Sequence, residues 1–279
     1  MLVFAKIKSV QQKIKSLKKG TSIGFVPTMG ALHKGHLSLI EQAKKENDIV
    51  VVSIFVNPTQ FNKQEDLANY PKTIDSDLSL LKSVYCDIVF TPSAEEIYNN
   101  NIISQLFNFD GLEHQMEGKF RDGHFDGVGT IVKRLFEIVT PTKSYFGEKD
   151  FQQFQIIRKM VEKNQIHTKI IGCEIYREDD GLAMSSRNSR LTKEHRAIAP
   201  FIYKTLKKAK KEFGIKNAQE VISWVENEFK KQPLLELEYF EIADEETLHP
   251  IKNKDPKQKY RAFIAVFADK IRLIDNISL

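Results

Sequence analysis

Apolar and polar residues follow one another in a pattern that predicts buried strands, each followed by an amphipathic helix. Short apolar runs bounded by glycine, proline or polar residues are typical of buried strands, and apolar positions spaced three and four apart indicate helices. The predicted strands are Ile23–Val26, Ile49–Val56, Ile88–Phe90, Ser144–Phe146 and Lys169–Ile175. The predicted helices are Leu37–Lys45, Ile74–Tyr85, Val128–Val139 and Gln152–Lys163. This alternation indicates an α/β fold with a parallel sheet and crossover helices.

The pattern changes after about Ile175. Helices are predicted over Thr192–Glu212 and Val221–Phe229, the second with Asn217 and Glu220 as its cap and reciprocal partner. Three strands follow, and a tight turn at Asp269 and Lys270 joins the last two; they are Glu238–Ile242, Ala262–Ala268 and Ile271–Ile277. We therefore expect two domains, residues 1–175 and a smaller C-terminal α+β domain of residues 176–279.

Composition describes an ordinary globular chain, with 41% apolar and 28% charged residues. Cys86 and Cys173 are too few and too far apart to suggest a disulfide framework. The longest apolar run, Ile49–Val56, is far too short to span a bilayer, so we expect no membrane partner. The net charge is +5, but its basic residues are scattered over predicted helix faces, so we expect small anionic substrates rather than nucleic acid.

Lysine crowds the N-terminus, where no acidic residue occurs before Glu41. A transit peptide is one interpretation, but such peptides favour arginine and serine. Here Ile7, Val10, Ile14 and Leu17 form a helical stripe, which favours a surface helix with a solvated lysine face. We expect the protein to be cytoplasmic.

Residues 23–36 combine the end of a strand, a glycine-punctuated loop and the start of a helix that carries two imidazoles, those of His33 and His36. A helix N-terminus attracts phosphate, because it offers unpaired N–H groups and a partial positive charge. Gly35 lets a ligand approach the backbone closely, and each histidine can donate a hydrogen bond. Two alternatives stay open: a metal pair, for which no third ligand sits nearby in the sequence, and ordinary satisfied side chains.

Polar residues follow two further predicted elements. Asn57 and Gln60 come after the second strand, where amides can orient a hydroxyl or carboxylate substrate, although Asn57 can also close an Asn–Pro turn. Asp75 and Asp77 stand in the first turn of the next helix. They either compensate the helix dipole or, in the case of Asp77, bind Mg²⁺.

Three glycine-containing segments are further candidates. Glu117–Gly127 is either a mobile loop that covers a site or an ordinary surface loop. Phe146–Gln153 places Lys149 at a helix start, where it can pair with phosphate charge, and Asp150 where it can cap that helix. Asp179–Asn188 holds two hydroxyls and an arginine at the expected domain boundary; they can bind phosphate, or form a turn and a helix cap.

The ten residues 27–36, Pro-Thr-Met-Gly-Ala-Leu-His-Lys-Gly-His, resemble the pantothenate synthetase (pantoate–β-alanine ligase) family. The shorter His-x-Gly-His is similar to the wider nucleotidyltransferase superfamily. The likeness extends in order and spacing from Phe25 to Asn188 and is weaker in the tail. It implies ATP-dependent condensation of pantoate with β-alanine to pantothenate, a coenzyme A precursor, through a pantoyl adenylate, with release of AMP and pyrophosphate.

The same resemblance implies a Rossmann-like N-terminal domain, a C-terminal lid, a Mg²⁺ requirement and a homodimer. It implies catalytic roles for His33, His36 and Lys149, and a place in the flexible loop for Arg121. The implied ATP-binding residues are Met29, His33, His36, Gly147, Lys149, Asp150, Met184, Ser185, Ser186 and Arg187, and the implied pantoate-binding residues are Gln60, Gln153, Asn57 and Tyr70.

Two departures from the family pattern concern the metal and the loop. Ser76 interrupts the pair of acids that often precedes the leucine of the Asp77 helix, and Asp122 replaces a proline, so we expect a less rigid loop. The alternatives are another adenylyl- or cytidylyltransferase that uses the same phosphate loop, and an ATP-binding regulatory module without turnover.

Overall fold

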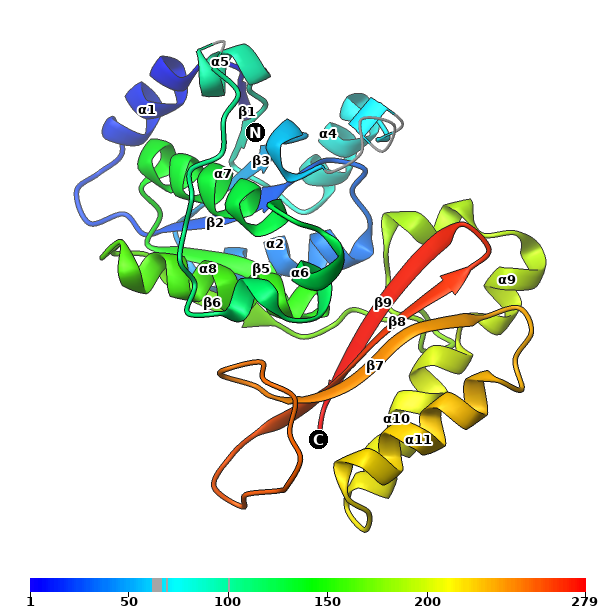
Figure 1. Ribbon diagram of the computed structural model, residues 1–279. Coiled ribbons are helices and arrows are strands. Elements are labelled where there is room, and N and C mark those ends of the chain that lie inside the picture. Colours follow the sequence, from blue (N-terminus) through cyan, green and yellow to red (C-terminus); the bar gives the residue numbers. More distant parts are fainter. Residues whose placement is uncertain (62–66, 69, 100) are drawn as a thin grey trace. The chain divides into compact units, whose positions relative to one another are not determined.

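The computed structural model describes residues 1–61, 67–68, 70–99 and 101–279 (Figure 1). Contacts between residues divide the chain into two compact units, which are interleaved in sequence. The first unit is Met1–Glu148 with Gln153–Glu174, and the second is Lys149–Gln152 with Ile175–Leu279. The short segment Lys149–Gln152 therefore groups with the C-terminal residues.

The first unit is built on a six-stranded parallel sheet in the order β1-β4-β3-β2-β5-β6. Its strands are β1 Leu2–Phe4, β2 Ile23–Thr28, β3 Ile49–Ile54, β4 Ile88–Phe90, β5 Lys143–Gly147 and β6 Lys169–Cys173. Its helices are α1 Ile7–Lys15, α2 Lys34–Glu46, α4 Ile74–Ser83, α5 Ala94–Tyr98, α6 Met116–Phe120, α7 His124–Val139 and α8 Phe151–Lys163. The first two residues of α8 belong to the second unit. The predicted α/β class with a parallel sheet is confirmed.

Side chains alternate across this sheet, as the pleat of a strand requires. Val26 and Val52 pack in one buried cluster with Ile40 of α2 and Leu81 of α4. Phe25, the residue before Val26, instead meets Phe136 of α7 edge to face, with ring centroids 6.2 Å apart. The continuous apolar runs of the sequence thus reflect burial on both faces of the sheet.

The second unit contains the predicted antiparallel strands, β7 Glu236–Asp244, β8 Tyr260–Ala268 and β9 Ile271–Ser278, in that order (Figure 1). Its helices are α9 Lys193–Ile198, α10 Phe201–Phe213 and α11 Ala218–Phe229, and residues of α10, α11 and the strands share one apolar core. The predicted cap of α11 is confirmed: Asn217 and Glu220 each bond the other's backbone N–H, both at 2.9 Å. Asp269 makes the tight β8–β9 turn with φ 53°.

Three predictions about the elements were wrong. The predicted helix Thr192–Glu212 is two helices, because Pro200 lacks the N–H that an unbroken helix needs and instead precedes α10. Much of the predicted loop Glu117–Gly127 is helical, since α6 occupies its start and α7 begins at His124. The edge strand β1 was missed, because three residues are too few for a recognisable alternation.

Among the described residues, no helix has both the length and the apolar character needed to cross a membrane.

Both cysteines of the first unit are covered, and this predicts their reactivity. Cys86 is 2% and Cys173 5% exposed, and burial raises the pKa of each thiol to about 12. At about pH 8 both groups are therefore uncharged as well as covered, and the thiolate is the reactive form. We expect intact-mass analysis to find no alkylation of the native protein by iodoacetamide. The same protein in denaturant should gain a label at each cysteine. Rapid labelling of either native thiol would contradict this burial.

Candidate active site

Strand β2 lies between β3 and β5, and all three run in the same direction. The chain leaves β2 toward β3 and β4 on one side and returns to β5 and β6 on the other. Ligands of open parallel sheets bind beyond the carboxyl ends of the strands at such a reversal. Residues 29–36 follow β2 at this edge, and residues 55–61 follow β3.

His33 and His36 stand at the start of α2, where the sequence predicted them. His33 is the N-cap residue, and the two imidazole rings lie with centroids 4.0 Å apart. The His36 Nδ1 accepts a hydrogen bond from the His33 backbone N–H at 3.3 Å. Because Nδ1 is the acceptor, the neutral imidazole of His36 carries its proton on Nε2. Both side chains are half-buried. Two partly exposed imidazoles therefore stand at a helix N-terminus, which carries a partial positive charge.

The loop that leads into these histidines is held by the carboxylate of Asp77. Its Oδ1 accepts from the Leu32 N–H at 2.8 Å, and its Oδ2 accepts from the Ala31 N–H and the Thr73 hydroxyl, both at 3.1 Å. Asp77 is 2% exposed. Gly30 is required beside it, since its φ is +84° and a Cβ there would stand 3.0 Å from Oδ2. The carboxylate is thus an anchor for the loop.

These bonds bear on the prediction of Asp77 as a metal ligand. Both of its oxygens already accept hydrogen bonds from the protein, and the side chain is 2% exposed, so little of the carboxylate is open to a hydrated Mg²⁺. Within the described part of the chain, no group of three His, Cys, Asp or Glu side chains is placed to hold a metal ion. The structure thus gives Asp77 the role of a loop anchor, and its predicted role as a metal ligand stays a prediction.

Gln60, a predicted pantoate-binding residue, lies beside Met29. Its Nε2 contacts the Met29 Sδ at 3.1 Å, and its Oε1 accepts from the Asn57 Nδ2 at 3.3 Å. A thioether is a weak acceptor, so a substrate oxygen could replace it at little loss. The structure thus brings together residues that follow β2 and β3.

Asn57 is 1% exposed and is bonded by the protein on both sides of its amide. Its Nδ2 also donates to the Gly127 carbonyl at 3.1 Å, and its Oδ1 accepts from the Tyr98 hydroxyl at 2.6 Å. A Cβ at Gly127 would lie 2.3 Å from the Thr59 carbonyl oxygen, so glycine allows this close approach. The amide of Asn57 therefore positions the Gln60 segment in this structure.

His124 and Tyr98 support the Gln60 segment and were not among the predicted site residues. The His124 Nδ1 lies 2.8 Å from the Gln60 carbonyl oxygen, which Arg121 also approaches through Nη2 at 3.5 Å. Tyr98 reaches the same segment through Asn57. These pairs are 64, 61 and 41 residues apart in sequence, respectively, so no local pattern could reveal them.

The other predicted residues of the first unit lie at element ends. Tyr70 is half-buried and meets Phe61 edge to face, with ring centroids 5.8 Å apart. Gly147 ends β5, and a Cβ there would meet no protein atom within 4 Å. Gln153 is half-buried in the first turn of α8.

In the second unit, the Lys149 Nζ lies 3.7 Å from the Asp150 Oδ1, and the Lys149 side chain is 16% exposed. Ser185 caps the short 3₁₀ helix Ser186–Arg190, because its hydroxyl accepts from the Arg187 N–H at 3.3 Å. Met184 and Ser186 are half-buried and Arg187 is exposed. The turn-and-cap interpretation of this segment is therefore correct as a description of its local structure.

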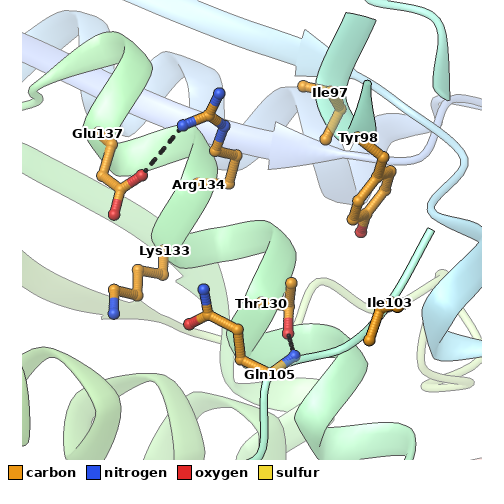
Figure 2. A pocket seen from close by; sticks show the side chains of 8 residues that line it. All are labelled: Ile97, Tyr98, Ile103, Gln105, Thr130, Lys133, Arg134 and Glu137. Atoms are coloured by element: carbon orange, nitrogen blue, oxygen red, sulfur yellow. Dashed lines mark hydrogen bonds and ion pairs between the residues drawn. The ribbon is translucent and has the colours of Figure 1, made fainter. Parts of the chain in front are cut away.

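A pocket of about 220 Å³ opens elsewhere in the first unit, between α5, α7 and the chain at residues 103–105 (Figure 2). Figure 2 shows Arg134 bonded to Glu137 on its wall, at 3.4 Å, and the Gln105 backbone N–H bonded to Thr130 at 2.8 Å. None of the predicted site residues lines it. We assign it no role in the site at the carboxyl edge.

Comparison with known proteins identifies the family of the chain. The family model for pantoate–β-alanine ligase matches residues 2–278. A pantothenate synthetase of Flavobacterium psychrophilum is 58% identical over the full length of both chains, and one of Bacteroides fragilis is 47% identical over 99% of this chain and 98% of its own.

Two solved structures are also similar to the chain. A pantothenate synthetase of Thermus thermophilus has a TM-score of 0.92 at 37% identity, with 99% of each chain covered. A pantoate–β-alanine ligase of Francisella tularensis, described as complexed with β-γ ATP and β-alanine, has a TM-score of 0.82 at 38% identity over 100% of this chain and 97% of its own.

The anchor formed by Asp77 predicts a loss of stability on substitution. Asp77→Ala leaves the buried Leu32 N–H and the partly buried Ala31 N–H without their acceptor, so we expect the free energy of unfolding to fall by about 3 kcal/mol. Asp77→Asn keeps one acceptor oxygen and should fall between this variant and the natural protein. Asp75→Ala is the matched control, because Asp75 is exposed in the same helical turn; we expect less than about 1 kcal/mol there. Urea unfolding measures all three. Equal losses at positions 75 and 77 would contradict the anchor.

Proposed function

The chain belongs to the pantoate–β-alanine ligase family, and we propose that it condenses pantoate with β-alanine by way of a pantoyl adenylate. The ATP and β-alanine named for the Francisella tularensis relative support ATP and β-alanine as substrates here. AMP and pyrophosphate would be the other products. The same proposal makes the protein a cytoplasmic enzyme of pantothenate biosynthesis that acts as a homodimer, with small-molecule substrates and neither nucleic acid nor membrane as partner.

One observation carries the proposal: the paired imidazoles of His33 and His36 begin α2 at the carboxyl edge of the sheet, on the loop that also carries Met29. Met29 in turn contacts Gln60. The residues to which we assign the phosphates and the acid substrate therefore lie at the same edge. This is the arrangement that joining an acid to the α-phosphate of a nucleotide requires.

The chemistry explains why the site needs no nucleophilic serine or cysteine. A carboxylate is a poor electrophile, but its attack on the α-phosphate of ATP displaces pyrophosphate and converts it to a mixed anhydride with AMP as a good leaving group. The amine of β-alanine then displaces AMP. Because both nucleophiles belong to substrates, catalysis depends on positioning and on donors that face developing charge.

We assign the residues accordingly. His33, His36 and Lys149 would donate to the phosphates, and Gln60 and Gln153 would hold pantoate. Tyr70 would help them, while Asn57 would act mainly by holding Gln60. The remaining ATP contacts would come from Met29, Gly147, Asp150, Met184, Ser185, Ser186 and Arg187, with Arg121 supporting the Gln60 segment. The closing of residues 176–279 as a lid stays a prediction.

Magnesium enters through the resemblance and through Asp77 as a candidate ligand. The carboxylate of Asp77 is bonded to Ala31, Leu32 and Thr73, and no group of three His, Cys, Asp or Glu side chains stands together in the described part of the chain. We therefore assign no residue to Mg²⁺ and derive no step from it.

Replacing His36 tests the phosphate role. His36→Ala removes a donor that faces developing charge, and we expect turnover to fall about a hundredfold. His114→Ala is the control, because His114 is an exposed histidine of the same unit, and it should leave turnover within about twofold. AMP formation and the urea midpoint should be measured for both. A His36→Ala variant that folds and keeps its rate would return the pair to a structural role.

Heavy-oxygen labelling tests the adenylate itself. If pantoate attacks the α-phosphate, one of its carboxylate oxygens stays on phosphorus when the amine displaces AMP. Pantoate labelled in its carboxylate should therefore deliver label to AMP and none to pyrophosphate, as mass spectrometry of the products would show. Omitting pantoate should abolish ATP–pyrophosphate exchange, which separates this enzyme from a nucleotidyltransferase with a phosphorylated acceptor. Label in inorganic phosphate, together with ADP, would overturn the adenylate.

A further inference from the structure

The segment that carries Lys149 is fastened to the C-terminal strands by side chains that no sequence motif marks. The Asn276 Nδ2 donates to the backbone carbonyl of Lys149 at 2.9 Å. Asn276 lies on β9 and is 2% exposed, and this bond is partly buried. Lys149 and Asn276 are 127 residues apart in sequence, yet both belong to the second unit.

Asn276 is itself held from two sides. Its Oδ1 accepts from the Arg261 Nη1 at 2.7 Å, and its backbone N–H donates to the Asp275 carboxylate at 2.8 Å. Arg177 bonds that carboxylate through both terminal nitrogens, at 2.7 and 2.9 Å. Burial raises the pKa of Asp275, and the Arg177 guanidinium opposes this shift. An amide fixed at both its oxygen and its backbone has little freedom to release the Lys149 carbonyl.

Arg261 adds a second point of attachment. Its guanidinium lies 3.9 Å from the ring centroid of Phe151, two residues after Lys149, and its Nε donates to Glu245 at 2.9 Å. Phe151 also contacts Phe263 of β8, with ring centroids 5.9 Å apart. The segment Lys149–Phe151 is thus held through its backbone by an amide on β9 and through its Phe151 ring by an arginine on β8.

We propose that Asn276, supported by Arg261, is a positioning residue for the reaction: it fixes the Lys149 peptide so that the ammonium group is presented to the nucleotide phosphates. The inference rests on the proposed phosphate role of Lys149. A lysine side chain has four rotatable bonds, and the reach of its ammonium group depends on where its backbone is held. Misplacing a charged donor by about 1 Å can cost about a hundredfold in rate.

Asn276→Asp is the sharpest variant. It keeps an acceptor for Arg261 and replaces the donor toward Lys149 with an oxygen that repels the carbonyl. We expect kcat for AMP formation to fall at least about tenfold, while KM for pantoate changes less than about twofold. Asn217→Ala is the control: it removes an asparagine cap from α11 of the same unit, which lowers stability without touching Lys149. It should leave kcat within about twofold.

A double-mutant cycle with Lys149→Ala separates positioning from general damage. If Asn276 acts through Lys149, Asn276→Asp should reduce kcat by less than about twofold once the lysine is gone. Equal fold-losses in the two backgrounds, or an unchanged kcat in the single variant, would overturn the inference alone. If Lys149→Ala keeps its rate, the assigned role of the lysine is wrong and the inference falls with it.

Asn276→Ala is the variant to measure if Asn276→Asp does not fold, because alanine places no charge against the Lys149 carbonyl. Failure of both to fold would make Asn276 a residue of the fold only and overturn the proposal.

Discussion

The parallel pairing of β2 with β3 on one side and β5 on the other is the constraint on which the candidate site depends. It brings the ends of three strands, which are far apart in sequence, to one edge. Met29 and the histidines follow β2, Asn57 and Gln60 follow β3, and Gln153 follows β5; Arg121, between α6 and α7, reaches the Gln60 carbonyl from elsewhere in the unit. Because the pairing is fixed by apolar residues on both faces of the sheet, the core and the site are specified by the same pattern.

Buried carboxylates in each unit hold backbone segments near residues with proposed roles. Asp77 accepts from the backbone N–H groups of Ala31 and Leu32, just before the paired histidines. Asp275 accepts from the backbone N–H of Asn276, whose side-chain amide donates to the Lys149 carbonyl. A buried charge is tolerated only when its hydrogen bonds are satisfied, and each of these has at least three donors. Such sites fix loops that propensity alone would leave mobile.

The sequence predicted what depends on local pattern and missed what depends on distant partners. Five of the six parallel strands, β2 to β6, and the helix that starts at the histidines follow from apolar periodicity and glycine placement, so they were predicted within a few residues. Pro200 is a local helix breaker, although the helix Thr192–Glu212 was predicted to run through it. By contrast, the bonds of Tyr98 and His124 to the Gln60 segment join residues 41 and 64 apart. No periodicity encodes such pairs.

A site whose nucleophiles come from its substrates places an unusual demand on its scaffold. With no covalent intermediate on the protein, the rate depends on how well several donors agree in position, and the donors assigned here come from more than one segment. Hydrogen bonds to backbone carbonyls, such as those to Gln60 and Lys149, control the position of a segment without occupying the side chain that acts. The residues that make these hydrogen bonds need no particular reactivity toward the substrates, yet the geometry of the reaction depends on where they hold each segment.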